Sequence, residues 1–434
     1  MPWRPQYCDF IQQLLLDFSD LIASQAFAQR ARHPDFPKAF TRDRKLPLPA
    51  LIATLLSMRS GSQQSLLDTF FTNLHASVGS SAAMVREVSD RAFAKARSHL
   101  HMPALNWLND WVIDRAQTAG MTLRWHGLRL VAADASVLMP AIRQCHRTRC
   151  AASADQRLFA LYLPDCELTL HASVHSADTS ERAMLMQALE CLGPDDVLLL
   201  DRGYPAAWLV SLLCERGIRF CMRCDKQGTG WGAVKKFLRT GEPQANVTLN
   251  APSAQDVQDW GCAPEAPQVR LVRHVSSNAQ VRVMATNLNS EDFPWECFGE
   301  LYHKRWRIEE AFKRLKHRMQ LEAVSGLSQQ ALIVDVAAKI LADNLVSLLC
   351  ASALADDPSH QADLAPRHQC NRSYAASAML RMLPSVLMFV GDVLATITQT
   401  LALLRGTTCR IIAGRSSPRP TSHVKPHARY AYKG

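Results

Sequence analysis

Apolar side chains recur at spacings of three and four residues through the first 120 positions, a period typical of amphipathic helices. The predicted helices cover 10–27, 48–58, 64–74 and 83–100. In the last of them Ser89 is the predicted N-cap, and Arg91, Lys95 and Arg97 are expected along an exposed face. Two interpretations stay open for this helix: the recognition helix of a helix-turn-helix unit, or an ordinary solvated basic helix.

Near residue 123 the pattern changes to short apolar runs typical of strands. Strands are predicted over 128–138, 157–163, 167–174, 196–200 and 218–223, and helices over 180–192 and 205–216. Early strands followed by alternating strands and helices predict a mixed α/β sheet. Short strands interrupted by glycines indicate a β-rich insertion at about 225–285, and helical periodicity returns from about 295 to 404.

Composition narrows the class of protein. Hydrophobic residues make up 48% and charged residues 20% of the 434 residues, which excludes a disordered chain. Lys and Arg number 49 against 39 Asp and Glu, and a basic excess of this size suggests a polyanionic partner. The 13 cysteines, an odd number in a long chain, favour reduced thiols and a cytosolic protein.

Two segments near the end of the chain have unusual composition. The window 383–404 is the most apolar, but Pro384 and Asp392 interrupt it. We therefore expect a buried helix or helix pair there, and no membrane partner. Basic residues and prolines without a single acid fill 405–434, which predicts a mobile tail suited to phosphate contact.

Two acids stand in apolar surroundings. Asp134 lies inside the predicted strand 128–138, and Asp201 follows the apolar run 197–200. Burying an uncompensated carboxylate is costly, and two on neighbouring strands repel each other unless a cation lies between them. Mg²⁺ and Mn²⁺ prefer carboxylate oxygens and keep positions open for a phosphate. Alternatively, each acid caps a strand end or pairs with an arginine such as Arg202.

A third feature is a predicted helix over 301–316. At about 100° per residue, Tyr302, Arg305, Glu309 and Lys316 share one stripe of about 60° along about 21 Å of helix. Glu309 would supply a third carboxylate for the metal. Arg305 and Lys316 would hold phosphates on either side of it, and Tyr302 could pack on a sugar or base.

The alternative for the same segment is a solvated helix with charge pairs such as Glu310 with Arg314. Such pairs account for the charges. They do not account for an aromatic, an acid and two bases on one face.

The spacing Tyr302-x2-Arg305-x3-Glu309-x6-Lys316 resembles the Y-R-E-K signature of insertion-sequence transposases of the IS-four family, in the DDE superfamily. Three further motifs resemble this family's first-aspartate strand, its second-aspartate motif and the motif that closes its β insertion; they are Val-Ala-Ala-Asp-Ala-Ser at 131–136, Leu-Leu-Asp-Arg-Gly-Tyr at 199–204 and Thr-Asn-Leu at 286–288. The resemblance spans roughly residues 35–350. Four motifs in the right order are specific together.

The resemblance implies an α/β fold with a ribonuclease H-like mixed-sheet catalytic core, interrupted by the β-rich insertion before the glutamate helix. The implied domains are a helical N-terminal DNA-binding domain at 1–120, the DDE catalytic domain at 121–350 with the insertion at about 225–285, and a helical C-terminal region with the basic tail at 351–434.

The resemblance also implies a function and its residues. Asp134, Asp201 and Glu309 would be the catalytic, metal-binding triad, with Mg²⁺ or Mn²⁺ as cofactor, in two ions. Tyr302, Arg305 and Lys316 would bind DNA. The implied partners are double-stranded DNA, as transposon ends and target, and a second copy of the chain in a homodimer on DNA. The implied location is the bacterial cytoplasm, at the nucleoid.

The expected activity is transposition: the element is cut at its ends and joined to target DNA by metal-dependent phosphoryl transfer. Two alternatives stay open, a repurposed DNA-binding protein without activity and a metal-dependent nuclease without strand transfer. Trp231 and Trp260 are candidates to hold a displaced base, although a place in the core of the β insertion is favoured. Cys221-Met-Arg-Cys224 lacks a second pair of metal ligands, so ordinary thiols are favoured there.

Overall fold

The computed structural model describes residues 7–42, 45–59, 61–77, 86–139, 156–225, 231–276, 279–326, 328–355 and 368–411. The chain divides into two compact units. A sheet unit comprises 121–137 and 157–312, and a helical unit comprises 1–120, 138–156 and 313–434. This division differs from the three consecutive segments predicted from the sequence, because helices from both ends of the chain pack together in the helical unit.

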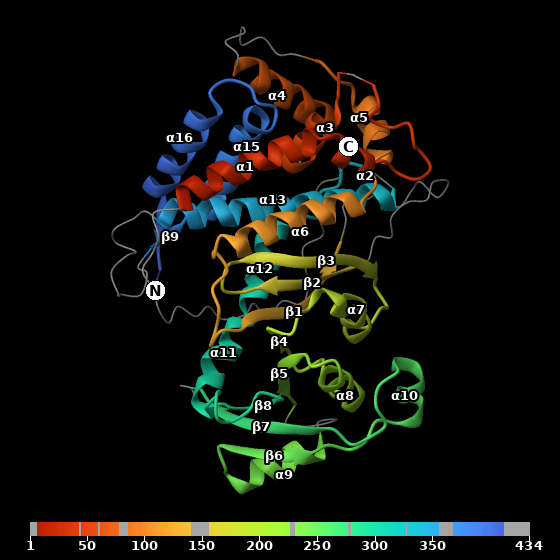
Figure 1. Ribbon diagram of the computed structural model, residues 1–434, viewed down its shortest axis with the longest axis vertical. Coiled ribbons are helices and arrows are strands. Elements are labelled where there is room, and N and C mark those ends of the chain that lie inside the picture. Colours follow the sequence, from red (N-terminus) through yellow and green to blue (C-terminus); the bar gives the residue numbers. More distant parts are fainter. Residues whose placement is uncertain are drawn as a thin grey trace. The chain divides into compact units, whose positions relative to one another are not determined.

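The sheet unit is built on one mixed sheet. Its strands are β1 (Arg129–Leu138), β2 (Gln156–Leu163), β3 (Leu168–Ser176), β4 (Asp196–Leu200), β5 (Arg219–Cys224), β6 (Gln244–Thr248), β7 (Gln268–Val275) and β8 (Val281–Thr286). Their order is β3-β2-β1-β4-β5-β8-β7-β6, one below another in Figure 1. β4 lies parallel to both β1 and β5, and all five of its residues are buried, as expected for a central parallel strand. The predicted mixed α/β sheet is confirmed.

The segment predicted as a β-rich insertion extends this same sheet. β8 pairs antiparallel with β5, and β7 and β6 follow, so the edge of β5 is covered. The segment also contains α9 (Gly232–Thr240) and α10 (Ala254–Trp260), which the sequence analysis did not predict. The side chain of Asn287, just after β8, accepts from Phe220 N at 2.9 Å and donates to Ile218 O at 2.9 Å, which fixes β8 against the start of β5.

Three further helices matter for the site. α7 (Glu181–Ala188) begins after Ser180, whose hydroxyl accepts from Ala183 N and so acts as the N-cap. The predicted single helix over 301–316 is wrong: α11 (Phe298–Lys304) and α12 (Arg307–His317) are separate. Between them the backbone tightens to three-residue turns, since Trp306 N bonds to His303 O and Glu309 N to Trp306 O.

The helical unit surrounds one long apolar helix. Its helices are α1 (Tyr7–Ala23), α2 (Gln25–Arg30), α3 (Leu48–Ser57), α4 (Gln63–Ala76), α5 (Asp90–Ser98), α6 (Pro103–Thr118), α13 (Gln329–Ala355), α15 (Arg372–Leu387) and α16 (Val393–Gly406). α13 contacts α1, α3, α6, α15 and α16, and Figure 1 shows it running beside α1 and α6. Apolar residues on all sides of α13 explain this central place.

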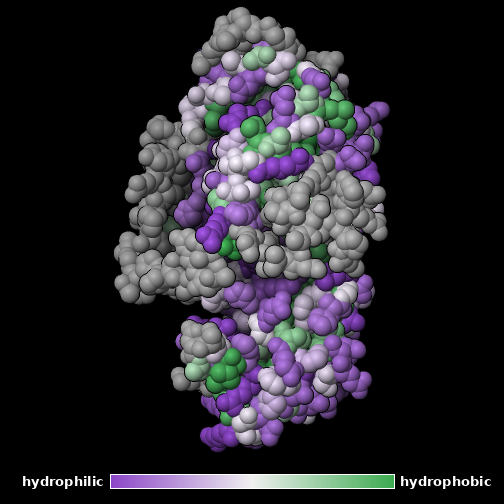
Figure 2. Space-filling model, turned by 90° about the vertical axis from the view of Figure 1, so that its left-hand side faces the viewer, coloured by the Kyte–Doolittle hydropathy of each residue, from purple (hydrophilic) through white to green (hydrophobic). Residues whose placement is uncertain are grey.

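The predicted apolar window 383–404 belongs to α15 and α16. No helix among the described residues is long and apolar enough to cross a membrane. The first residues of the predicted basic tail are ordered: Arg405 lies in α16, and Arg410 ends the strand β10 (Thr408–Arg410), which pairs with β9 (His368–Cys370). Residues 412–434 of that tail lie outside the described residues. Figure 2 shows that hydrophilic side chains cover most of the visible face of the sheet unit.

The helix predicted over 83–100 begins later, as α5, and Ser89 is its N-cap as expected, because its hydroxyl accepts from Ala92 N. Arg91 and Lys95 are exposed. Arg97 is not: its guanidinium lies over the Phe93 ring, with 5.6 Å to the centroid, and donates to Ser325 Oγ. The prediction of Arg97 on the exposed face is therefore wrong, since it turns to the same side of the helix as Phe93, four residues before.

Candidate active site

The two aspartates lie on adjacent parallel strands. The register of β1 with β4 runs from Arg129 opposite Asp196 to Ala132 opposite Leu199. Continued by two residues, it sets Asp134 opposite Asp201, just beyond the end of β4. Both acids thus reach the same edge of the sheet, where ligands bind in sheets of this kind.

Arg305 joins Asp134 to Glu309. Its Nη1 lies 3.3 Å from Asp134 Oδ2, and its Nη2 lies 2.8 Å from Glu309 Oε1. Only 6% of the Arg305 side chain is exposed. The alternative interpretation that a buried acid pairs with an arginine therefore holds for Asp134, but the partner is Arg305, whereas Arg202 is exposed.

Tyr302 packs behind this arginine. The Arg305 guanidinium lies over the Tyr302 ring, with 5.8 Å to the centroid. The ring is 3% exposed, and burial raises the pKa of Tyr302 to about 12. Its hydroxyl has no hydrogen-bond partner among the described residues. The ring is thus not presented for stacking on a base, and the hydroxyl is buried with it.

Lys316 falls in the part of α12 that belongs to the helical unit. Its Nζ lies 3.5 Å from Glu322 Oε1, an oxygen that also accepts from Met139 N at 3.0 Å. One residue pair fixes this end of α12: Arg314 Nε donates at 2.9 Å to Oδ1 of Asp343, whose side chain is buried. Of the predicted stripe, Tyr302, Arg305 and Glu309 come together in the sheet unit, and Lys316 belongs to the other unit.

Burial and like charge act against an ionised Asp134. Burial raises the pKa of Asp134 to about 7, Arg305 opposes the shift, and Asp201 and Glu181 add to it. Burial and Asp201 likewise raise the pKa of Glu181. Burial is thus the main cause that disfavours the ionised form of both acids, and the neighbouring carboxylates add to it.

These residues fit a divalent cation in their chemistry. Carboxylate oxygens are the ligands that Mg²⁺ and Mn²⁺ prefer, and a cation would relieve the repulsion between Asp134 and Asp201. The turn requires a glycine at position 203, because a Cβ there would lie only 3.1 Å from Asp201 Oδ1 and 3.7 Å from Glu181 Oε2. Within the described part of the chain, however, no three acid, histidine or cysteine side chains converge closely enough to hold a metal ion.

The other candidates from the sequence were two tryptophans and two cysteines, and their surroundings are as follows. Trp260 stacks on Trp208 with ring centroids 4.3 Å apart, which joins α10 to α8 (Ala207–Glu215). Trp231 is the residue before α9. Cys221 and Cys224 are buried in β5, and burial raises the pKa of both thiols.

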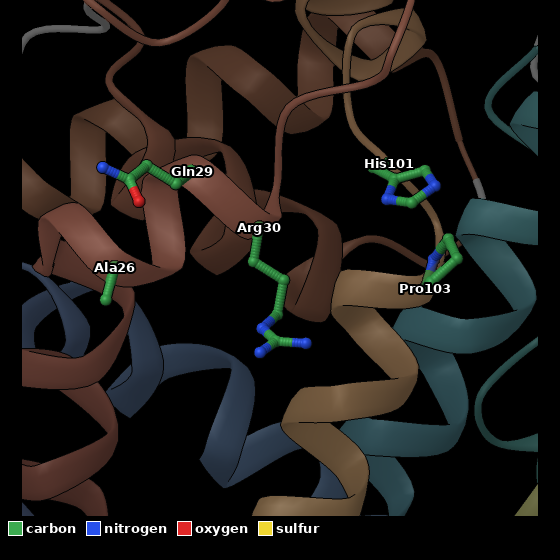
Figure 3. A pocket seen from close by; sticks show the side chains of 5 residues that line it. All are labelled: Ala26, Gln29, Arg30, His101 and Pro103. Carbon is green, nitrogen blue, oxygen red and sulfur yellow. The ribbon is translucent and has the colours of Figure 1, made fainter.

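A separate hollow lies in the helical unit (Figure 3), with a volume of about 410 Å³. It is lined by Ala26, Gln29, Arg30, His101 and Pro103. The Arg30 guanidinium lies over the Trp107 ring, with 4.6 Å to the centroid. None of the predicted site residues lines it.

The family described as "Transposase DDE domain" matches residues 125–345, more than half of the chain. The chain belongs to this DDE transposase family. The family is a class of metal-dependent enzymes that cleave DNA and transfer strands. The predicted ribonuclease H-like class of fold is confirmed, and all six predicted site residues lie inside the matched range.

A relative is "Transposase InsG for insertion sequence element IS4" of Escherichia coli strain K12. It is 25% identical over 187 residues, which cover 42% of this chain and 41% of that protein. The similarity thus spans less than half of the relative's length and agrees with the family membership.

Tyr204 was not among the site residues predicted from the sequence. The sequence did contain a signal for this residue. A tyrosine closely follows the second aspartate, at a position where packing alone would require only an apolar ring. The Tyr204 side chain is fully buried, and burial raises its pKa well above the usual value, with the charges of Glu181, Asp134 and Asp201 adding to the shift.

Proposed function

We propose that this protein is a transposase that cuts an insertion sequence at its ends and joins it to target DNA by phosphoryl transfer. The supporting observation is the sheet edge itself: Asp134 and Asp201 reach it from adjacent parallel strands, and Arg305 links Glu309 to Asp134. Asp134, Asp201 and Glu309 are the proposed catalytic, metal-binding residues.

The cofactor in this proposal is Mg²⁺ or Mn²⁺, in two ions. Bound there, the ions would activate a water or a 3′-hydroxyl and stabilise the leaving oxygen of the scissile phosphate. Asp134 and Asp201 provide the carboxylates on the sheet. Glu309, which now pairs with Arg305, would be the third carboxylate to hold a cation.

In this proposal Arg305 also binds DNA. Once released from Asp134 and Glu309, its guanidinium is free to bind a DNA phosphate, for which its planar donors are suited. Tyr302 contributes to DNA binding through its ring, which supports Arg305. Lys316 contributes a further phosphate contact from the end of α12.

The proposed partners are double-stranded DNA, as transposon ends and as target, and a second copy of the chain. Two ends have to be cut together, which a homodimer on DNA provides. In the helical unit, Arg91 and Lys95 on α5 are exposed and available for DNA, whereas Arg97 is used inside the unit.

A strand-transfer experiment tests the proposal. The purified chain is mixed with Mg²⁺, a labelled duplex that carries the DNA ends flanking its gene, and a supercoiled target plasmid. We expect cleavage at the end and a joined product with the plasmid. Cleavage without joining would support the nuclease alternative, and binding without cleavage would support the repurposed DNA-binding protein.

A further inference from the structure

α11 and the turn after it lie against one face of the sheet, over β7 and β8. The Arg270 guanidinium of β7 lies over the Phe298 ring, with 5.2 Å to the centroid, and that of Arg282 on β8 lies over the Trp306 ring, with 6.0 Å. Arg270 pairs with Thr286, which is four residues after Arg282 on β8, so both arginines point to this face.

Arg223 on β5 points to the same face. It lies opposite Met284 of β8, two residues from Arg282, so the two arginines are diagonal neighbours with Cα atoms about 7–8 Å apart. Continued by one residue, the register of β4 with β5 sets Asp201 opposite Arg223. The charge of Arg223 also opposes the rise in the pKa of Tyr302, which agrees with this position. The two arginines thus lead away from the sheet edge that carries the predicted acids.

Both arginines lack an acidic partner. The strands β5, β6, β7 and β8 contain no Asp or Glu. Among the described residues, neither guanidinium forms a hydrogen bond or an ion pair, not even with Asp225, which directly follows β5. Arg270 differs, since its Nη1 donates to Phe293 O at 2.7 Å within the fold. Arg223 and Arg282 therefore leave positive charge uncompensated on this face of the sheet.

We propose that Arg223 and Arg282 form a phosphate-binding surface that holds DNA as it runs from the sheet edge across β5 and β8. This inference rests on the proposed function and adds two residues to its DNA contacts. The planar donors of a guanidinium suit phosphate oxygens, and a row of phosphates fits two unpaired cations on one face. Trp306, which is 43% exposed, supports Arg282 through its ring, as Tyr302 supports Arg305.

Binding of the full chain to a labelled duplex that carries the DNA ends flanking its gene, followed by fluorescence anisotropy, tests this surface without using cleavage. Arg273→Gln is the matched control, because Arg273 lies on β7 opposite Val283 and so points to the other face of the sheet. We expect Arg223→Gln and Arg282→Gln each to weaken binding about tenfold and to lower the slope of log affinity against log salt by about 1. Arg273→Gln should bind as the wild type does.

Two further results separate phosphate contact from packing. Arg223→Lys keeps the charge and so retains the wild-type salt slope. The melting temperatures of Arg223→Gln and Arg282→Gln stay close to that of the wild type, because neither guanidinium has a hydrogen bond or ion pair to lose among the described residues. Wild-type affinity in both glutamine variants, or an equal loss in Arg273→Gln, would overturn the inference.

Glu309→Ala separates this inference from the proposed function. If Glu309→Ala loses cleavage with Mg²⁺ while Arg223→Gln and Arg282→Gln bind DNA as the wild type does, only the inference fails. If the two arginine variants bind DNA more weakly but the wild type does not cleave it, the proposed transposition fails and the DNA-binding surface stands. If the wild type does not bind the duplex, both fail.

Discussion

The Arg305 guanidinium lies between Asp134 and Glu309, 3.3 Å from the first carboxylate and 2.8 Å from the second. The buried Arg305 guanidinium thus pairs with carboxylate oxygens that would be the ligands of a divalent cation. In the proposed function, metal binding and DNA binding would be coupled, because a phosphate that attracts Arg305 would also release both acids.

Replacing this arginine tests the coupling. In Arg305→Gln the two carboxylates lose their internal cation, so we expect Mn²⁺ to bind the DNA-free protein about tenfold more tightly, which corresponds to about 1.4 kcal/mol. Arg307→Gln is the control, since Arg307 is half exposed and pairs with Glu167. Weaker Mn²⁺ binding in Arg305→Gln would show that Arg305 supports the metal site and does not compete with it.

The raised pKa of Asp134 predicts how stability depends on pH. Its pKa rises from 3.8 to about 7, mainly through burial. Between these values the folded state holds a proton that the unfolded state has lost, so stability falls as the pH rises from about 4 to 7. The loss is at most about 4 kcal/mol, at about 1.4 kcal/mol per pKa unit.

Thermal unfolding of Asp134→Asn measures this effect. We expect the variant to gain stability relative to the wild type between pH 5 and pH 8, and Mg²⁺ at pH 8 to stabilise the wild type but not the variant. A stability difference that stays constant over this range would show that Asp134 remains ionised throughout.

Much of the sheet could be predicted from the sequence. The apolar runs around Asp134 and before Asp201 are local signals, and β1 and β4 form where those runs lie. The N-caps Ser89 and Ser180 are equally local, because their hydroxyls bond within their own helices. An acid in a buried strand is recognisable in the same way.

Features that depend on contacts between segments far apart in the sequence could not be predicted. A uniform helical period over 301–316 places Arg305 on a smooth stripe, but the tight turns at Trp306 break the helix. The burial of Arg97 depends on Ser325, far away in the sequence. The sequence also contains no local sign that β8 pairs with β5 and extends the central sheet.

The close approach at Gly203 gives a further prediction. In Gly203→Ala the new Cβ would press on Asp201 Oδ1 at 3.1 Å, tighter than ordinary contact, and so move the carboxylate. We expect DNA cleavage to fall by about tenfold or more, since small displacements at a reacting centre are costly. Gly232→Ala is the control, because its Cβ would have no atom within 4 Å. Equal cleavage rates in both variants would contradict a role for this close approach.

Lys316 is expected to act through charge alone. In Lys316→Ala, binding to end DNA should weaken for all sequences alike, and the slope of log affinity against log salt should fall by about 1. Lys313→Ala, at an exposed position of the same helix, is the control for general surface charge. An unchanged salt dependence in Lys316→Ala would remove this residue from the proposed DNA contacts.

In the proposed function, Glu309 completes the set of catalytic carboxylates. Cleavage of a labelled duplex that carries the DNA ends flanking the gene, with Mg²⁺, compares the wild type with Glu309→Ala and with Glu310→Ala, its exposed neighbour on α12. We expect metal-dependent cleavage by the wild type and by Glu310→Ala. We expect Glu309→Ala to bind DNA without cleaving it. Cleavage by Glu309→Ala at the wild-type rate would contradict this expectation.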